Sequence, residues 1–413
     1  MQEEVLDYMH HDTEAITGIK RNRIITVSLV TLCRSFHTLS IGGIALFLPL
    51  IRKDLGLSFT QGGSLSAATT AVYALMQIPA GYLTDRFGPK RPFFIGALGT
   101  TVLLFTFGLV SEYWQALVNQ SLAGFFHALL FQSGLTLITE WFPPHRRATA
   151  TALISIGALL GTIILSIVGP LLVVEFTWRF PFISFASVGI IVSFIFLHFG
   201  KEPPLTGEQR KVTMREMLQL FRYRAMWVCG ILQYIRLAVL QGVAFWLPSL
   251  LIDEKGLSLQ ITGLIIAVRA GFSAPSNVLG GYISDRLRNP TIVIGFSLII
   301  LAITTGLFTV TNNTVVLVAL IFTNAVFVQM YFGPLFTVPV EILGTRVAGI
   351  SRGFSNFFAN IGSLSFVYIM GALRDTTGSF RFGFYAIVVA CVIGLVFTVL
   401  LAQIRHKTIG TST

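Results

Sequence analysis

Five basic side chains lie near the middle of long apolar segments of this chain: Arg34, His37, His127, Arg236 and Arg269. No aspartate or glutamate lies at a comparable depth in any of those segments. An arginine stays protonated in essentially any protein environment, and an unpaired charge in an apolar interior is costly. The three arginines therefore need water or an anion beside them. This pattern favours a water-filled cavity of positive potential, which concentrates anions and repels cations.

The arginines and histidines suit different tasks. The planar guanidinium group binds carboxylate or phosphate oxygens in pairs, so Arg236 and Arg269 are candidates for binding an anionic substrate. Arg34 is assigned either to the substrate path or to an inner gate. His37 and His127 titrate nearer neutral pH than other deep side chains. They are candidates for carrying a proton, and the alternative is a neutral hydrogen-bonding role.

The spacing of these residues indicates one shared site. His37 lies twelve residues before Pro49, and Arg236 lies twelve residues before Pro248, so the two occupy similar depths. One segment carries polar side chains at helical spacing: Arg269, Ser273, Ser276 and Asn277. Aromatic side chains near the charges are candidates for contacting an organic group, with packing or lipid contact as the alternative: Phe36, Tyr73, Tyr234, Trp246, Tyr331 and Phe357. Among these, Tyr331 is included in the predicted binding site.

The composition indicates the environment of the elements that position these residues. Of the 413 residues, 54% are hydrophobic and only 11% are charged, and the mean hydropathy is +0.77. Soluble proteins carry roughly 25% charged residues. These values disfavour a cytosolic enzyme and exclude a disordered or collagen-like chain. They favour a protein whose surroundings are mostly lipid.

Twelve stretches are long and apolar enough to cross a bilayer as helices, which predicts an all-α membrane protein. Their approximate ranges are 24–50, 59–84, 92–111, 115–138, 148–173, 180–199, 225–251, 259–284, 290–311, 314–338, 347–372 and 381–404. A polar linker at 200–224 divides them into two groups of six. The predicted divisions are a tail at 1–23, a bundle at 24–199, the linker, a bundle at 225–404 and a tail at 405–413.

The distribution of basic residues predicts the orientation. Twenty Lys and Arg residues lie on the side of both termini and six on the other side. Because cytoplasmic loops carry the excess of basic residues, both termini are expected in the cytoplasm and the protein in the plasma (cytoplasmic) membrane. The net charge of +11 then reflects topology, so no nucleic-acid partner is expected.

The N-terminal tail and the cysteines add little chemistry. The first nineteen residues are polar and acidic, without a cleavable signal peptide, and are expected to be loosely ordered. Cys33, Cys229 and Cys391 are widely spaced in apolar stretches, which predicts neither disulfides nor a metal site.

The two halves of the chain resemble each other at an offset near 200 residues. The stretch "GLSFTQGGSLSAATTAVYALMQIPAGYLTDRFGPKR" starts at Gly56, and "GLSLQITGLIIAVRAGFSAPSNVLGGYISDRLRNP" starts at Gly256. The second half repeats Gly81, Asp85 and Arg86 as Gly281, Asp285 and Arg286. Glu140 lies 201 residues before Glu341. Two similar halves related by an axis along the membrane normal are a known transporter plan.

Three loops carry a family resemblance. "GYLTDRFGPKR" (81–91) resembles the signature loop between the second and third spans of the major facilitator superfamily, and "GYISDRLR" (281–288) resembles its second copy. "EWFPPHRRATA" (140–150) resembles the loop between the fourth and fifth spans of that family. The resemblance covers essentially the whole chain. It implies twelve transmembrane helices in two pseudo-symmetric six-helix bundles, a substrate path between them and usually a monomer.

The resemblance also implies gating roles for the loop residues. In the family these loops latch the halves together on the cytoplasmic side and release during alternating access, which implies gating roles for Asp85, Arg86, Arg91, Asp285 and Glu140. A glycine in the motif lets two helices approach closely, and an Asp can pair with the positive N-terminus of a neighbouring helix. The alternative is that these charges only set the topology.

Two departures from the family pattern bear on mechanism. Gln120 precedes Gly124 where the fourth span often carries an Arg that is linked to proton coupling in some members. The stretch "GALLGTIILSIVGPLL" (157–172) lacks the full glycine run of the drug-antiporter branch, which disfavours drug export.

The predicted function is secondary active transport of a small organic anion, a carboxylate or a phosphate ester. Rocker-switch alternating access is expected, by proton symport or anion exchange, with membrane lipids and a small anion as partners and without a cofactor. The alternatives are a nitrate-type inorganic anion carrier, a lipid or drug exporter, or a receptor without turnover. An enzyme is disfavoured because the sequence has no nucleotide-binding glycine loop and no metal-ligand cluster.

Overall fold

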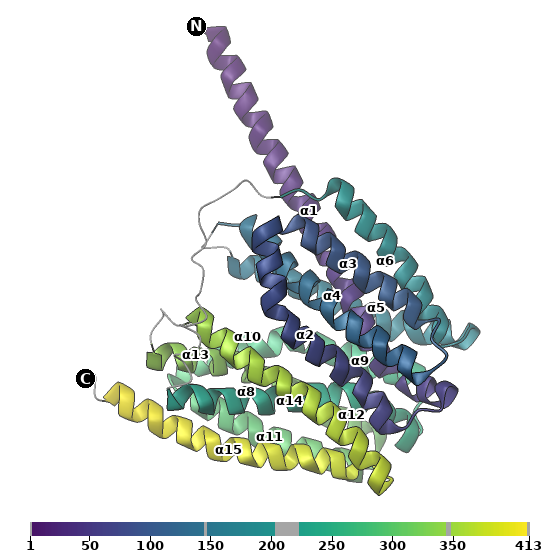
Figure 1. The fold of residues 1–413 in the computed structure, drawn as a ribbon. Helices are drawn as coiled ribbons and strands as arrows, with labels where there is room; N and C mark the ends of the chain where they lie inside the picture. The colour runs from purple at the N-terminus through teal and green to yellow at the C-terminus, as the bar shows by residue number, and fades with distance from the viewer. Residues whose placement is uncertain (1, 144–146, 203–222, 344–347, 411–413) are drawn as a thin grey trace.

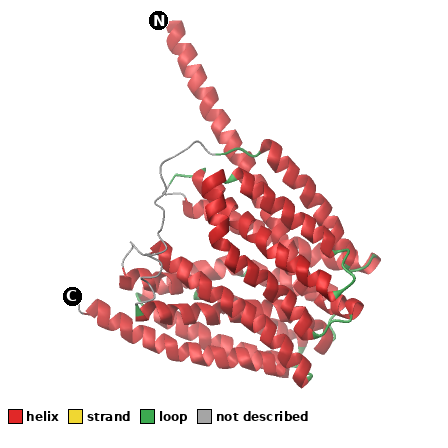
Figure 2. Cartoon of the chain, viewed as in Figure 1, coloured by secondary structure: helices red, strands yellow, loops and turns green. Residues whose placement is uncertain are grey.

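The computed structural model describes residues 2–143, 147–202, 223–343 and 348–410, and these ranges contain helices and loops but no strand (Figure 2). The first half contains α1 (Gln2–Leu55), α2 (Phe59–Phe87), α3 (Lys90–Phe107), α4 (Tyr113–Glu140), α5 (Arg147–Glu175) and α6 (Arg179–Phe199). The second half contains α8 (Arg224–Ser249), the π-helical turn η3 (Leu250–Glu254), α9 (Leu259–Gly271), α10 (Ser273–Leu287), α11 (Pro290–Val310), α12 (Thr314–Met330), α13 (Phe332–Leu343), α14 (Ala348–Thr377) and α15 (Arg381–Gly410).

Each of the twelve predicted spans corresponds to helix, because backbone groups inside a membrane must be hydrogen-bonded within the segment. Nine helices of the described ranges are long and apolar enough to cross a bilayer by length and composition. Large apolar side chains such as Leu75, Val278 and Val315 are exposed on the surface. Lipid is the solvent that such a surface requires, and the chain is an integral multi-pass membrane protein.

Two predicted spans are each divided into two helices. The span at 259–284 is interrupted at Phe272, and the span at 314–338 is interrupted at Tyr331. In both cases a proline follows the interruption by three residues, Pro275 and Pro334. Proline has no N–H to bond the carbonyl four residues earlier, and its ring clashes with that carbonyl. The first half has Leu75 and Gly134 at the corresponding positions, and α2 and α4 are continuous there.

The N-terminal segment differs from the prediction of a loosely ordered tail. Helix α1 is continuous from Gln2 and projects beyond the other helices (Figure 1). The physical reason is that residues 2–23 contain no proline and a single glycine, Gly18, whose cost in a helix interior is only about 1 kcal/mol relative to alanine. Of the polar linker, residues 203–222 lie outside the described ranges.

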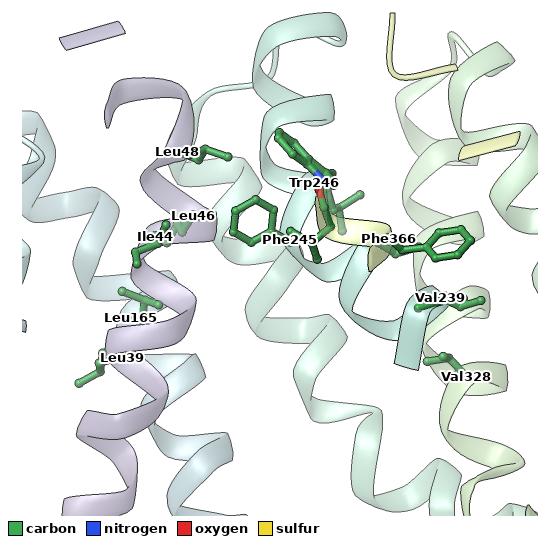
Figure 3. Close-up of a cluster of buried hydrophobic side chains, with 14 of the residues drawn as sticks. Leu39, Ile44, Leu46, Leu48, Leu165, Val239, Phe245, Trp246, Val328 and Phe366 are labelled. Carbon is green, nitrogen blue, oxygen red and sulfur yellow. Dashed lines mark hydrogen bonds between the residues drawn. The ribbon is translucent and has the colours of Figure 1, made fainter. Parts of the chain in front are cut away.

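The two bundles converge at the end that lies away from both termini (Figure 1). Helix α2 packs on α14, α5 packs on α9, and α1 packs on α8. Buried apolar side chains from both halves lie in this region, among them Leu46 and Leu165 from the first half and Phe245 and Trp246 from the second (Figure 3).

Repeated glycines allow this close approach. A Cβ at Gly63 would lie 2.7 Å from the backbone oxygen of Val367, on α14. A Cβ at Gly263, the residue at the same place in the repeat, would lie 2.0 Å from the backbone oxygen of Ser166, on α5. The internal repeat therefore produces two similar contacts between the halves.

Candidate functional site

A cavity of about 340 Å³ lies between the two halves. Its walls come from α1, α2 and α5 on one side and from α8, α9, α10, α12 and α14 on the other. The polar and charged side chains that line it are Arg34, His37, Thr38, Ser66, Thr162, Ser166, Gln241, Arg269, Ser273 and Gln329. Its volume falls within the range of about 300–1,000 Å³ that small-molecule sites occupy.

A side chamber of about 180 Å³ adjoins the cavity. The two spaces share Arg34, His37, Ile41, Ser66 and Gln241. The chamber reaches α4 and α14, and its other lining residues are Ile44, Thr69, Thr70, Tyr73, Gln120, His127, Leu237, Asn360 and Ser363. Gln120, which replaces the expected family arginine, accepts a hydrogen bond from the Thr69 hydroxyl at 3.0 Å.

Arg34 and Arg269 face the cavity from opposite halves. Nε and Nη1 of Arg34 and Nε of Arg269 are buried without a hydrogen-bond partner among the described residues. The guanidinium carbon of Arg34 lies 5.2 Å from the centre of the Phe131 ring, a contact that does not neutralise the charge. Within the described part of the chain, no Asp, Glu or Lys lines either space. The site therefore presents two fixed positive charges to a ligand.

His37 and His127 are brought together although ninety positions separate them in the chain. Their ring centres lie 4.2 Å apart with the planes at 89°. Both side chains are buried, and none of the four ring nitrogens has a hydrogen-bond partner among the described residues. The pair lines the side chamber. Arg34 and Tyr73 line the same chamber.

Arg236 lies outside both spaces. Its side chain is 6% exposed, its Nε donates a hydrogen bond to Oε1 of Gln233 at 3.0 Å, and its guanidinium carbon lies 4.5 Å from the centre of the Phe332 ring. Helix α8 lines the cavity with the face that carries Leu240, Gln241, Ala244 and Pro248. Successive helical residues are rotated by about 100°, and Arg236 is turned away from the centre of that face toward α13.

Tyr331 is also separate from the cavity. It is fully buried at the interruption between α12 and α13, and its hydroxyl has no hydrogen-bond partner among the described residues. The cavity is instead lined at this level by Gln329, two residues earlier. The predicted site therefore divides: Arg34, His37, His127 and Arg269 share one connected space, whereas Arg236 and Tyr331 lie within the second bundle.

Of the residues that resemble the family motifs, Asp85, Arg86, Arg91 and Asp285 are exposed and Glu140 is half-buried. Asp85 and Arg86 lie in the last turn of α2, Arg91 lies at the start of α3, and Asp285 lies near the end of α10. Within the described ranges, no ion pair joins Asp85 or Asp285 to the opposite half. Glu140 is the last residue of α4, and residues 144–146 of its loop lie outside the described ranges. The gating roles of all five stay predictions.

The motif glycines do not make the expected close contacts. A Cβ at Gly81 or Gly281 would meet nothing within 4 Å. The tight position is the preceding residue of the second copy, because a Cβ at Gly280 would lie 1.8 Å from the backbone oxygen of Met330. The corresponding residue of the first copy is the buried Ala80.

A polar cluster at the converged end of the bundles was not predicted from the sequence. The carboxylate of Asp375, near the end of α14, accepts hydrogen bonds from the backbone N–H groups of Phe59 and Thr60 at 2.9 and 2.7 Å. Arg52 of the first half pairs with Asp253 of the second half at 3.8 Å. These residues read as ordinary loop charges in the sequence. The sequence did contain one indication of this contact. Ser58 is the N-cap of α2, and the first-turn backbone N–H groups that its side chain does not bond are free to bind an acidic side chain.

Two similar helical bundles with a cavity between them are the plan of a class of membrane transporters. Residues 30–367 match the Major Facilitator Superfamily, and the chain belongs to that family. The chain is 24% identical to the hexuronate transporter of Bacillus subtilis (strain 168) over 394 residues, which cover 88% of this chain and 91% of the relative.

Two further comparisons are consistent with this assignment. The chain is 27% identical to the probable galactarate/D-glucarate transporter GudP of Escherichia coli (strain K12) over 391 residues, covering 83% of this chain and 84% of the relative. The crystal structure of a bacterial homolog of the human lysosomal transporter Spinster, inward-facing and unoccupied, superimposes with a TM-score of 0.80 at 20% identity, covering 94% of this chain and 98% of that one. These relatives are named as transporters, and the chain is grouped with them rather than with enzymes.

Proposed function

We propose that this protein is a secondary active transporter of a small organic anion of the sugar-acid type. The observation that carries the proposal is the placement of Arg34 and Arg269, from opposite halves, on one cavity without an acidic side chain among the described residues. Guanidinium groups bind carboxylates in pairs of hydrogen bonds. The hydroxyl and amide groups of Ser66, Gln241 and Gln329 suit a hydroxylated carbon chain. The names of the relatives favour a carboxylate over a phosphate ester.

Transport then follows alternating access. The halves are in contact at the end away from the termini, through the pairs α2–α14 and α5–α9. With both termini in the cytoplasm, as the basic residues predict, this state is the inward-open one. Opening to the other side requires separation of Gly63 from Val367 and of Gly263 from Ser166. The exposed loop charges Asp85 and Asp285 would close the cytoplasmic side in the opposite state.

The coupling is either proton symport or anion exchange. His37 and His127 support symport because two imidazoles with unbonded nitrogens adjoin the cavity. A proton on either ring would be repelled by Arg34 until an anion binds beside it, which links protonation to substrate binding. Exchange needs no such pair and would proceed without a proton gradient.

Uptake into proteoliposomes tests the function. Purified protein is reconstituted, and the accumulation of labelled galacturonate is compared with that of galactose, which has the same ring without the charge. Saturable uptake of galacturonate alone supports the proposal. Transport of nitrate or glucose 6-phosphate in place of any carboxylate would assign the protein to another anion class, and the absence of flux for every anion from a folded sample would refute the proposal.

A further inference from the structure

We propose that the cavity is built for a dianion with one carboxylate at each end of a hydroxylated chain, rather than for a monoanion. The proposal rests on the proposed function and specifies its substrate class. One carboxylate would bind Arg34 of the first half and the other would bind Arg269 of the second half.

The first argument for a dianion is the number of fixed positive charges in the cavity. Arg34 and Arg269 are the arginines that line the cavity and its side chamber, and no lysine or acid joins them among the described residues. The nearby titratable groups are His37 on α1, Tyr73 on α2 and His127 on α4. None of these supplies a negative counter-charge at neutral pH. The protein therefore leaves two positive charges for the ligand to balance.

The second argument is that the two arginines lie on different halves of the protein. Arg34 lies on α1 and Arg269 on α9. Nε and Nη1 of Arg34 and Nε of Arg269 are buried without a protein partner among the described residues. A monoanion bound at one arginine leaves the other cation without a counter-charge in a largely apolar setting, which is unfavourable. A dianion satisfies both and connects the two bundles through its own carbon chain.

The rest of the lining suits the middle of such a molecule. Besides the two arginines the cavity offers neutral hydrogen-bonding groups from both halves, among them Thr38, Ser66, Gln241, Ser273 and Gln329. These groups donate to and accept from hydroxyls without favouring a charge. Ala45, Leu46, Phe245 and Val367 line the remainder and supply no charge.

Two probes with one carbon skeleton test the proposal. Galactarate and galactonate differ in that the sixth carbon is a carboxylate in the first and a hydroxymethyl group in the second. Isothermal titration of the full-length detergent-solubilised protein at neutral pH should show galactarate binding at least roughly tenfold more tightly. Arg34→Gln and Arg269→Gln should each reduce this preference to near unity. The control Arg381→Gln, at an exposed site on α15, should leave the preference unchanged.

Charge-preserving variants separate a binding role from a folding role. Arg34→Lys and Arg269→Lys keep the charge and should keep most of the preference for galactarate, with weaker absolute binding of both probes. Equal affinity for the two probes in the wild type, or a preference that survives both glutamine variants, would overturn the dianion proposal. Tight binding of galactonate would then still support an organic-anion carrier. A folded wild-type sample that binds neither probe would overturn the proposed function together with this inference.

Discussion

At the scale of single residues, the direction of a side chain decides which deep cation lines the cavity. Arg269 and Arg236 have the same chemistry and similar depth in their spans, but only Arg269 lines the cavity. Arg236 is held by Gln233 and Phe332 inside the second bundle. Substitution of Arg269 is therefore expected to change ligand binding, whereas substitution of Arg236 is expected to change stability.

Arg236→Lys should lower stability and leave substrate affinity unchanged within about twofold. The lysine ammonium cannot keep the Nε bond to Gln233 or the planar contact with Phe332, and it is more strongly hydrated than a guanidinium. The loss of one buried charge-assisted hydrogen bond corresponds to about 1.5–3 kcal/mol. Thermal unfolding should shift downward by several degrees while titration with galactarate gives the wild-type affinity. A large loss of affinity at unchanged stability would place Arg236 in the binding site.

A separate prediction concerns proton coupling through His37 and His127. If they carry the coupled proton, an inward proton gradient should accelerate uptake by the wild type, and His37→Gln or His127→Gln should remove most of that acceleration. Exchange between internal and external substrate should continue in both variants, because it needs no net proton movement. His198→Gln, at an exposed position near the end of α6, is the matched control. Uptake by the wild type that is indifferent to the gradient would favour exchange or uniport.

At the scale of elements, proline breaks distinguish the second half from the first, and glycine contacts join the two halves. Pro275 and Pro334 divide the eighth and tenth spans, so the second half has breaks that the first half lacks. Both breaks lie next to cavity residues, Arg269 and Gln329. Between the halves, the contacts at Gly63 and Gly263 depend on the absence of a side chain.

Gly263→Ala should weaken the closed end. Its methyl group would lie 2.0 Å from the Ser166 backbone oxygen, so α5 and α9 must separate. Overpacking typically costs about 1–3 kcal/mol, enough to shift the population several-fold toward an arrangement open at that end. Spin labels at Glu112 and Thr376, exposed in opposite halves, would report longer distances.

A matched glycine provides the control for this variant. Gly353→Ala, on α14, adds the same methyl group where nothing lies within 4 Å, and it should leave the distance distribution unchanged. Both substitutions raise helix propensity equally. The same distances in the two variants would show that the Gly263 contact does not hold the halves together.

At the scale of the whole molecule, the asymmetry of the basic residues predicts the orientation of the protein. Single cysteines introduced at Glu112 and Arg288, in loops at opposite ends of the bundles, test it in a background without native cysteine. A membrane-impermeant maleimide should label the Glu112 variant in intact cells and the Arg288 variant only after permeabilisation. The reverse pattern would place both termini outside and would make this state the outward-open one.

Much of the architecture follows from local sequence. Each span satisfies its own backbone hydrogen bonds, so hydropathy alone located the twelve segments, and the repeat at an offset of 200 indicated the two similar halves. The breaks at Phe272 and Tyr331 had a local signal as well, in Pro275 and Pro334, although hydropathy predicts each span as one helix.

For the candidate site, deep cations without deep acids in the sequence predict a binding place for an anion, and that role stays a prediction. The tertiary structure alone decided which of those cations line one cavity. Packing sets the rotation of each helix, and it turned Arg34 and Arg269 into one cavity while Arg236 faced α13. Packing also placed His37 beside His127 and Asp375 at the first turn of α2, because contacts between distant segments depend on how whole helices fit together rather than on the spacing within any one of them.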